Sequence, residues 1–153
     1  MTVTDRKPPF RFSHVTRVGF DETDAQGVVY YGRYLPYFDR ALVEYLRHLG
    51  LLHAGPADRE FVMRANRVEY HAPARFDDLL EVFVRVERIG TTSITYDHAA
   101  YRVDEDGDSD TLMATAKATL VCIDLGERKA VPVPAAFRER IARFEQAVAS
   151  GPS

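Results

Sequence analysis

The chain has 153 residues, of which 46% are hydrophobic and 28% are charged. This length suits one folded domain, and the composition excludes a disordered or fibrous protein. A formal net charge of -3 excludes a broad basic surface for nucleic acid, because phosphate binding requires clustered Lys and Arg.

Residues 1–11 are polar and contain Pro8 and Pro9, so we expect a flexible N-terminal tail. The tail has no apolar run that could serve as a signal peptide, and no stretch approaches the roughly 20 apolar residues that span a bilayer. We therefore expect a cytoplasmic protein without membrane insertion. The only cysteine, Cys122, lies in an apolar run and is expected to be a buried thiol.

The first predicted elements are a strand over residues 12–18 and a helix from about Gly32 to Leu49. β-branched residues partly alternate in the strand segment. Pro36 is tolerated only in a first turn or at a kink, which places the helix start close to Gly32. Large apolar residues recur at helical spacing and predict a helix packed on a sheet as the central core element: Leu35, Phe38, Leu42, Tyr45, Leu46 and Leu49.

Beyond a loop, we predict four further strands, at residues 61–70, 79–89, 93–103 and 111–123. Within 80–89, valines alternate with charged residues, which indicates a sheet with one covered face. The short turn 90–92 and the polar loop 104–110 indicate antiparallel hairpins. A final helix is predicted over residues 135–149. This order predicts one α+β domain over residues 12–149, followed by a short tail at 150–153.

A candidate active site lies ahead of the long helix. Asp21, Glu22 and Asp24 precede Gly27, a residue that would permit close approach of the backbone to a ligand. A helix N-terminus offers unpaired N–H donors and partial positive charge, which suits an oxygen that becomes negative during a reaction. Taken alone, an Asp in such a loop is more often a turn or capping residue. The surrounding pattern makes Asp24 a candidate catalytic carboxylate.

Other motifs favour no competing chemistry. The Asp-rich loop 104–110 lacks the Glu of an EF-hand, whose position falls on Thr115, and it is interpreted as a solvated hairpin tip. The five histidines show no metal-ligand spacing, so we expect no metal site. The sequence has no hydrolase-elbow, P-loop or dinucleotide-binding motif.

The segment 20–31, Phe-Asp-Glu-Thr-Asp-Ala-Gln-Gly-Val-Val-Tyr-Tyr, resembles the active-site segment of the 4-hydroxybenzoyl-CoA thioesterase family of hotdog-fold proteins. The later segments 68–78, 90–93 and 120–124 resemble in particular the acyl-CoA thioesterases encoded with the Tol–Pal envelope system. The resemblance covers about residues 12–137. It implies a hotdog fold, in which a curved antiparallel sheet of about five strands wraps a long central helix, with a C-terminal helix added. It also implies a homodimer or homotetramer with sites between subunits.

The resemblance assigns roles to individual residues. Asp24 would act as nucleophile or general base, the backbone N–H of Tyr31 as oxyanion donor, and Gly27, Val28 and Tyr30 as residues that shape the site. Some close members have a histidine where this chain has Tyr31, so a histidine-assisted step is not expected. Seven further residues are candidates for the acyl pocket (Tyr34, Tyr37 and Phe38) or for coenzyme A contacts (Arg75, Arg88, Thr92 and Ser93).

The expected reaction is hydrolysis of a short-chain aliphatic or aromatic acyl-CoA, or of an acyl carrier protein thioester, without a cofactor because coenzyme A is part of the substrate. A hydratase or dehydratase of the same fold is one alternative, although residues 18–37 contain no histidine for proton transfer. A non-catalytic acyl-binding or interaction module is another, and the carboxylate beside the helix start argues against it.

Overall fold

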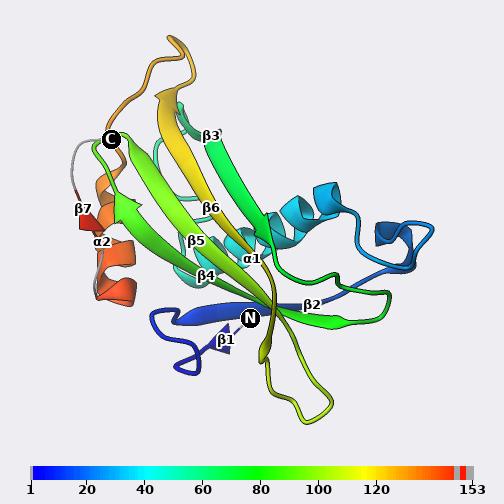
Figure 1. The fold of residues 1–153 in the computed structure, drawn as a ribbon. Coiled ribbons are helices and arrows are strands. Elements are labelled where there is room, and N and C mark those ends of the chain that lie inside the picture. Colours follow the sequence, from blue (N-terminus) through cyan, green and yellow to red (C-terminus); the bar gives the residue numbers. More distant parts are fainter. Residues whose placement is uncertain (1, 147–148, 151–153) are drawn as a thin grey trace.

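The computed structural model describes residues 2–146 and 149–150, so the end of the expected C-terminal tail, 151–153, lies outside the described residues. One long helix lies across a curved sheet, and a shorter C-terminal helix packs at the sheet's end (Figure 1). The helical elements, in chain order, are η1 (Phe20–Glu22), η2 (Tyr31–Arg33), α1 (Tyr34–His48) and α2 (Ala135–Glu145). The strands are β1 (Thr2–Val3), β2 (Phe12–Arg17), β3 (Arg59–Tyr70), β4 (Leu79–Ile89), β5 (Ser93–Arg102), β6 (Thr111–Asp124) and β7 (Ala149–Ser150).

The sheet is antiparallel apart from the short β7, which pairs in parallel with β4. Its order is β1-β2-β4-β5-β6-β3. The two predicted hairpins, β4–β5 and β5–β6, are confirmed, and the bounds of the five long strands agree with the predicted ones to within two residues. Together with the long helix and the C-terminal helix, this sheet confirms the predicted hotdog arrangement.

Helix α1 buries a stripe of aromatic and apolar side chains against the sheet: Tyr34, Tyr37, Phe38, Ala41, Leu42 and Tyr45. The predicted stripe included Leu35, which is instead 38% exposed. Tyr34 and Leu35 are adjacent and so point to different sides of the helix, and packing on the sheet buries Tyr34 and leaves Leu35 outside. The helix start was predicted correctly, since η2 begins at Tyr31 and leads directly into α1.

Part of the segment expected to be a flexible tail is held on the sheet. β1 pairs with β2, and Arg6 donates to both carboxylate oxygens of the buried Glu81, at 3.0 Å for Oε1. Burial by itself would raise the pKa of Glu81, but hydrogen bonds from Arg6, Ser13 and Ser109 outweigh it and lower that pKa. A buried carboxylate requires such partners, and this explains why residues 2–6 are fastened to the sheet.

Helix α2 is fastened by a buried carboxylate at its last turn. Glu145 Oε2 accepts hydrogen bonds from the Tyr45 hydroxyl at 2.6 Å and from the Val86 N–H at 3.0 Å. β2 pairs with β4 only as far as Val84, so the Val86 N–H lies beyond this ladder and finds its acceptor in α2. The predicted helix over residues 135–149 thus ends at Glu145, and 147–148 lie outside the described residues.

Two further expectations concern Cys122 and the membrane. Cys122 is buried and has no disulfide partner, as predicted. None of the helices in the described part of the chain is long and apolar enough to cross a bilayer.

Candidate active site

Asp24 lies in a short turn between η1 and η2. The Asp24 N–H donates to the Val28 carbonyl at 2.9 Å, and the Gly27 N–H donates to the Asp24 carbonyl at 3.0 Å. The turn is tied to a second segment, because the Val29 N–H donates to the Ala74 carbonyl at 2.7 Å. These backbone bonds fix the position of Asp24 although its side chain is exposed.

Gly27 adopts φ of +77°, a conformation that L side chains rarely adopt. We expected this glycine to permit close approach of the backbone to a ligand. A Cβ built at Gly27 would meet no heavy atom within 4 Å, so the space around it is open. The glycine is therefore required by the backbone conformation of the turn and not by crowding within this chain.

The carboxylates of the acidic turn are used differently. Glu22 accepts the Gly19 N–H at 2.7 Å and lies 3.3 Å from the Arg40 guanidinium, so it stabilises the entry to the turn. Asp24 Oδ1 accepts only the nearby Gln26 N–H, at 2.8 Å, among the hydrogen bonds of the described side chains. Asp21 and Asp24 are both exposed, but of the three carboxylates only Asp24 lines the pocket described next.

The helix start faces the same space as Asp24. Tyr31 is the first residue of η2, and the N–H at such a position has no acceptor within its own helix. A concave pocket of about 580 Å³ brings both residues together. Its lining consists of Asp24, Gln26, Val28, Val29, Tyr30, Tyr31, Tyr34, Tyr70, His71, Ala72, Pro73 and Arg75.

An aromatic wall closes one side of this pocket. Tyr34 is 2% exposed, and its hydroxyl accepts the Ala74 N–H at 3.2 Å. Burial raises the pKa of Tyr34, so its hydroxyl is protonated at neutral pH. The Tyr70 ring lies 4.9 Å from that of Tyr31 and 5.5 Å from that of Tyr34, measured between centroids.

Tyr37 and Phe38, expected in the acyl pocket, do not line it within one chain. They are 0% and 3% exposed and lie in the core beneath Tyr34, with ring centroids 6.0 and 6.5 Å from its own. Burial, followed by the nearby Glu22 carboxylate, raises the pKa of Tyr37. Both residues pack against the core side of Tyr34 and so stabilise the aromatic wall.

The residues expected to contact coenzyme A are divided between two places. Arg75 lines the pocket, and its backbone bridges to Val28 in the Asp24 turn. Arg88, Thr92 and Ser93 lie at the far end of the β4–β5 hairpin, about 30 Å along the strands from the pocket end of β4. Within one chain, these three residues and Asp24 do not form a single site.

Six lining residues of the pocket were not among the predicted site residues: Gln26 and Val29 beside Asp24, and the run Tyr70, His71, Ala72 and Pro73. This run begins at Tyr70, the last residue of β3, which lies beside β6 and far from the Asp24 turn in sequence. The only sequence signal for this run was the segment 68–78, whose resemblance to the Tol–Pal-associated thioesterases strengthens the subgroup assignment. A hydrogen bond fixes the backbone of His71 beside the sheet, because the His71 N–H donates to the Met113 carbonyl at 2.8 Å.

Comparison with known proteins shows which family the chain belongs to. The family model of the thioesterase-like superfamily matches residues 18–141. The chain is 34% identical over 137 residues to the acyl-CoA thioester hydrolase YbgC of Escherichia coli, covering 88% of this chain and 96% of that protein. It is 33% identical over 126 residues to the acyl-CoA thioesterase YbgC of Haemophilus influenzae, covering 80% and 88%.

Among solved structures, a 1,4-dihydroxy-2-naphthoyl-CoA thioesterase from Synechocystis superposes with a TM-score of 0.75 at 26% identity, covering 86% of this chain and 95% of that one. The family match spans both the Asp24 segment and the strands that complete the pocket. The chain therefore belongs to the thioesterase-like superfamily and is an enzyme of the thioester hydrolase class.

Proposed function

We propose that the protein hydrolyses an acyl-CoA thioester in the pocket that contains Asp24 and the start of η2. The observation that carries this proposal is that an exposed carboxylate and the first residue of a helix, whose N–H has no acceptor within that helix, line one concave pocket. Two relatives that share about a third of their residues with this chain are named as acyl-CoA thioester hydrolases, which supports the same substrate class.

In the proposed reaction the Asp24 carboxylate attacks the thioester carbonyl carbon, or it takes a proton from a water molecule that attacks instead. The carbonyl oxygen becomes negative and accepts a hydrogen bond from the Tyr31 N–H. Collapse of the tetrahedral intermediate breaks the carbon–sulfur bond, and coenzyme A leaves as a thiolate that takes up a proton. On the direct route this collapse leaves an anhydride between Asp24 and the acyl group, which water then hydrolyses. After a single turnover in ¹⁸O water, an unlabelled acid product together with ¹⁸O in the Asp24 carboxylate would show direct attack, because water has then attacked the Asp24 carbonyl of the anhydride.

Replacement of the carboxylate tests the proposal. In Asp24→Asn we expect kcat/KM for the best acyl-CoA to fall by about 10²–10⁴-fold, as for loss of a general base. Asp21→Asn is the matched control, because Asp21 is exposed in the same acidic segment but does not line the pocket. Thiol release is measured over a panel of short-chain and aryl-CoAs, and wild-type turnover by Asp24→Asn would refute the assignment.

We also propose that a second subunit completes the site. Arg88, Thr92 and Ser93 lie too far from Asp24 to serve the same pocket within one chain, so contacts to coenzyme A from these residues would come from a partner. The long edge strand β3 offers a surface for such pairing, because it has β6 on one side and no strand of the described chain on the other. A homodimer, or a homotetramer built from it, would bring the Asp24 pocket of one subunit together with Arg88, Thr92 and Ser93 of the other.

The pocket's lining supports a proposal for the acyl group, and the names of the relatives support one for its carrier. Tyr31, Tyr34 and Tyr70 give it an aromatic wall, which suits a short aliphatic or an aromatic acyl group. Coenzyme A is the carrier that we propose, and acyl carrier protein is the second to assay. Association with the Tol–Pal system and a cytoplasmic location stay predictions, which a genomic-neighbour survey and cell fractionation would test.

One observation favours testing a hydratase or dehydratase activity as well. The Asp24 segment itself contains no histidine, but the fold places His71 on the pocket lining. This activity would be measured by incubating the protein with a 2-enoyl-CoA and detecting the addition of water by mass spectrometry. If His71→Gln abolished such an addition while thiol release continued, the second activity would be established. If acyl-CoA bound without either reaction, the protein would be a binding module.

A further inference from the structure

A second cavity lies at the opposite end of α1 from the Asp24 pocket. It has a volume of about 320 Å³, roughly twice that of an engineered apolar cavity that accepts benzene. None of its lining residues lines the Asp24 pocket. Leu46 and Tyr34 mark the two ends of the helix, about 18 Å apart along its axis. The cavity is therefore separate from the site proposed for catalysis.

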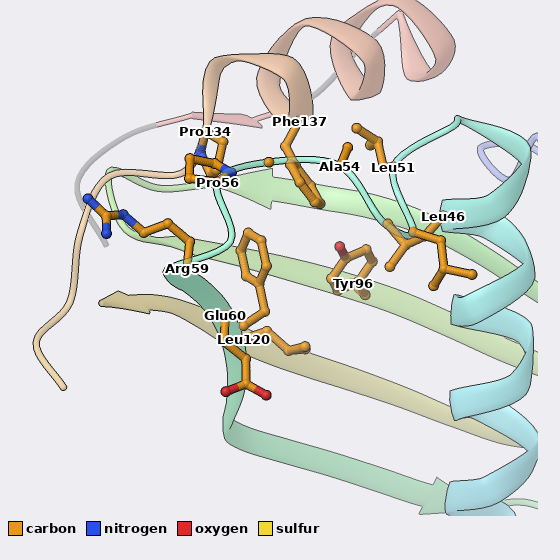
Figure 2. Close-up of a pocket in the computed structure, with 13 residues that line it drawn as sticks. Leu46, Leu51, Ala54, Pro56, Arg59, Glu60, Tyr96, Leu120, Pro134 and Phe137 are labelled. Atoms are coloured by element: carbon orange, nitrogen blue, oxygen red, sulfur yellow. The ribbon is translucent and has the colours of Figure 1, made fainter. Parts of the chain in front are cut away.

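Three parts of the fold build this cavity (Figure 2). The last turn of α1 and the loop that follows contribute aliphatic side chains, α2 contributes Phe137 from its first turn, and the sheet contributes Phe61, Tyr96 and Leu120. The Phe61 and Phe137 rings pack with their centroids 5.0 Å apart. The cavity is thus mostly apolar, as small-molecule sites usually are.

Tyr96 supplies the polar group of the cavity that a ligand could pair with. Its side chain is 2% exposed, and no residue of the described chain forms a hydrogen bond with its hydroxyl. Figure 2 shows the hydroxyl among the labelled apolar side chains, directed toward the loop that carries Ala54. Burial raises the pKa of Tyr96, so the hydroxyl is protonated at neutral pH and can donate as well as accept. Tyrosine hydroxyls within the fold usually find a hydrogen-bond partner, and a ligand in the cavity could serve as that partner for Tyr96.

The charges at the cavity's mouth indicate what kind of ligand fits. Arg59 is already paired with Asp58 at 2.9 Å and with Asp124 at 2.8 Å. Figure 2 shows the charged groups of Arg59 and Glu60 pointing away from the apolar side chains. An anionic ligand would lose its hydration without gaining an unpaired cationic side chain as a partner, and the neighbouring carboxylates would repel it. The cavity therefore suits an uncharged molecule.

We propose that this cavity is a second small-molecule site, which binds an uncharged ring or short alkyl compound carrying one hydroxyl or carbonyl group that pairs with the Tyr96 hydroxyl. The assignment does not depend on the proposed thioesterase reaction, because the two pockets share no lining residue.

The test uses phenol, toluene and benzoate, three probes of similar size, with methyl-labelled wild-type protein and NMR titration. Phenol is expected to shift the leucine methyls that line the cavity and to leave those of Val28 and Val29 in the Asp24 pocket unmoved, both with and without excess coenzyme A. The reporting leucines are Leu46, Leu51, Leu52 and Leu120. Toluene should bind the same residues, and benzoate should bind at least about tenfold more weakly than phenol because its carboxylate is charged.

Two variants make the test specific. Tyr96→Phe keeps the ring and removes the hydroxyl, so phenol affinity should fall by about fivefold to tenfold while toluene affinity is unchanged. Ala54→Leu fills the cavity from the loop side and should weaken both probes. The proposal fails if phenol shifts only the Val28 and Val29 methyls, if it shifts none, if benzoate binds as tightly as phenol, or if Tyr96→Phe binds phenol like the wild type.

Discussion

Gly27 is the residue whose backbone conformation sets the turn that carries Asp24. Its φ of +77° would be strained for any L side chain, and yet nothing lies within 4 Å of a Cβ built there. A substitution should therefore act through the backbone alone, by distorting the turn and displacing the Asp24 carboxylate.

For Gly27→Ala we expect the free energy of unfolding to fall by about 1–2 kcal/mol, the cost of a left-handed conformation for an L residue. We also expect thioesterase kcat to fall, because the carboxylate moves relative to the Tyr31 N–H. Gly107→Ala is the matched control, since Gly107 has φ of +88°, equally open space and a position at a hairpin tip. Urea unfolding should show the same loss of stability in both variants. Thiol-release kinetics should show a loss of activity in Gly27→Ala only. Equal activity losses in the two variants would contradict this explanation.

Among the elements, α2 depends on the Glu145 carboxylate, which joins it to α1 and β4. Burial raises the pKa of Glu145, although hydrogen bonds from Tyr45 and Val86 oppose this effect. A carboxyl whose pKa is higher in the folded state than in the unfolded chain binds its proton more tightly when folded. Stability then rises as pH falls through the folded pKa toward the unfolded value, and this gain is lost again as pH increases.

Glu145→Gln should remove this pH dependence and leave stability at pH 8 unchanged or slightly higher, because the amide oxygen still accepts both hydrogen bonds without a charge. Glu145→Ala should lower the free energy of unfolding by about 1–3 kcal/mol, since the buried Val86 N–H and Tyr45 hydroxyl lose their acceptor. Chemical unfolding from pH 5 to pH 8 measures both. An identical pH profile for the wild type and Glu145→Gln would show that Glu145 is not the titrating group.

At the scale of the whole molecule, the open edge of β3 is the feature that a single chain leaves unexplained. This strand has a bulge after Met63, and Met63 is 48% exposed. Long edge strands with exposed apolar residues are normally covered by another chain or protected by charge. The proposed subunit pairing would cover this edge.

Met63→Lys should weaken self-association of the purified protein by about tenfold or more, and activity per chain should fall at dilute concentration because the partner's part of the site is lost. Val15→Lys is the control, since Val15 is similarly exposed, at 40%, on β2 near the opposite edge of the sheet. Sedimentation equilibrium and dilution-dependent kinetics measure both effects. A fully active wild-type monomer would overturn the proposal of a shared site.

The secondary structure could be predicted from the sequence to a large extent. Alternation in the β4 segment, the Gly-containing loop between β5 and β6 and the position of Pro36 are local signals, and the structure places strand and helix bounds close to the predicted ones. The orientation of α1 was less predictable, because Leu35 and Tyr34 fit a helical stripe equally well by spacing. Contacts with the sheet determine that Tyr34 is buried and Leu35 is exposed.

The sequence by itself determined the elements, the acidic turn, the helix start and the family resemblance, since all of these depend on residues close together in the chain. Only the tertiary structure decided which distant segments meet. It placed Tyr70 and His71 beside Asp24, moved Tyr37 and Phe38 into the core behind the pocket, and separated Arg88 from Asp24 by the length of a strand. The physical reason is that side-chain periodicity specifies which face a residue occupies, whereas strand order and helix packing depend on contacts between segments far apart in sequence.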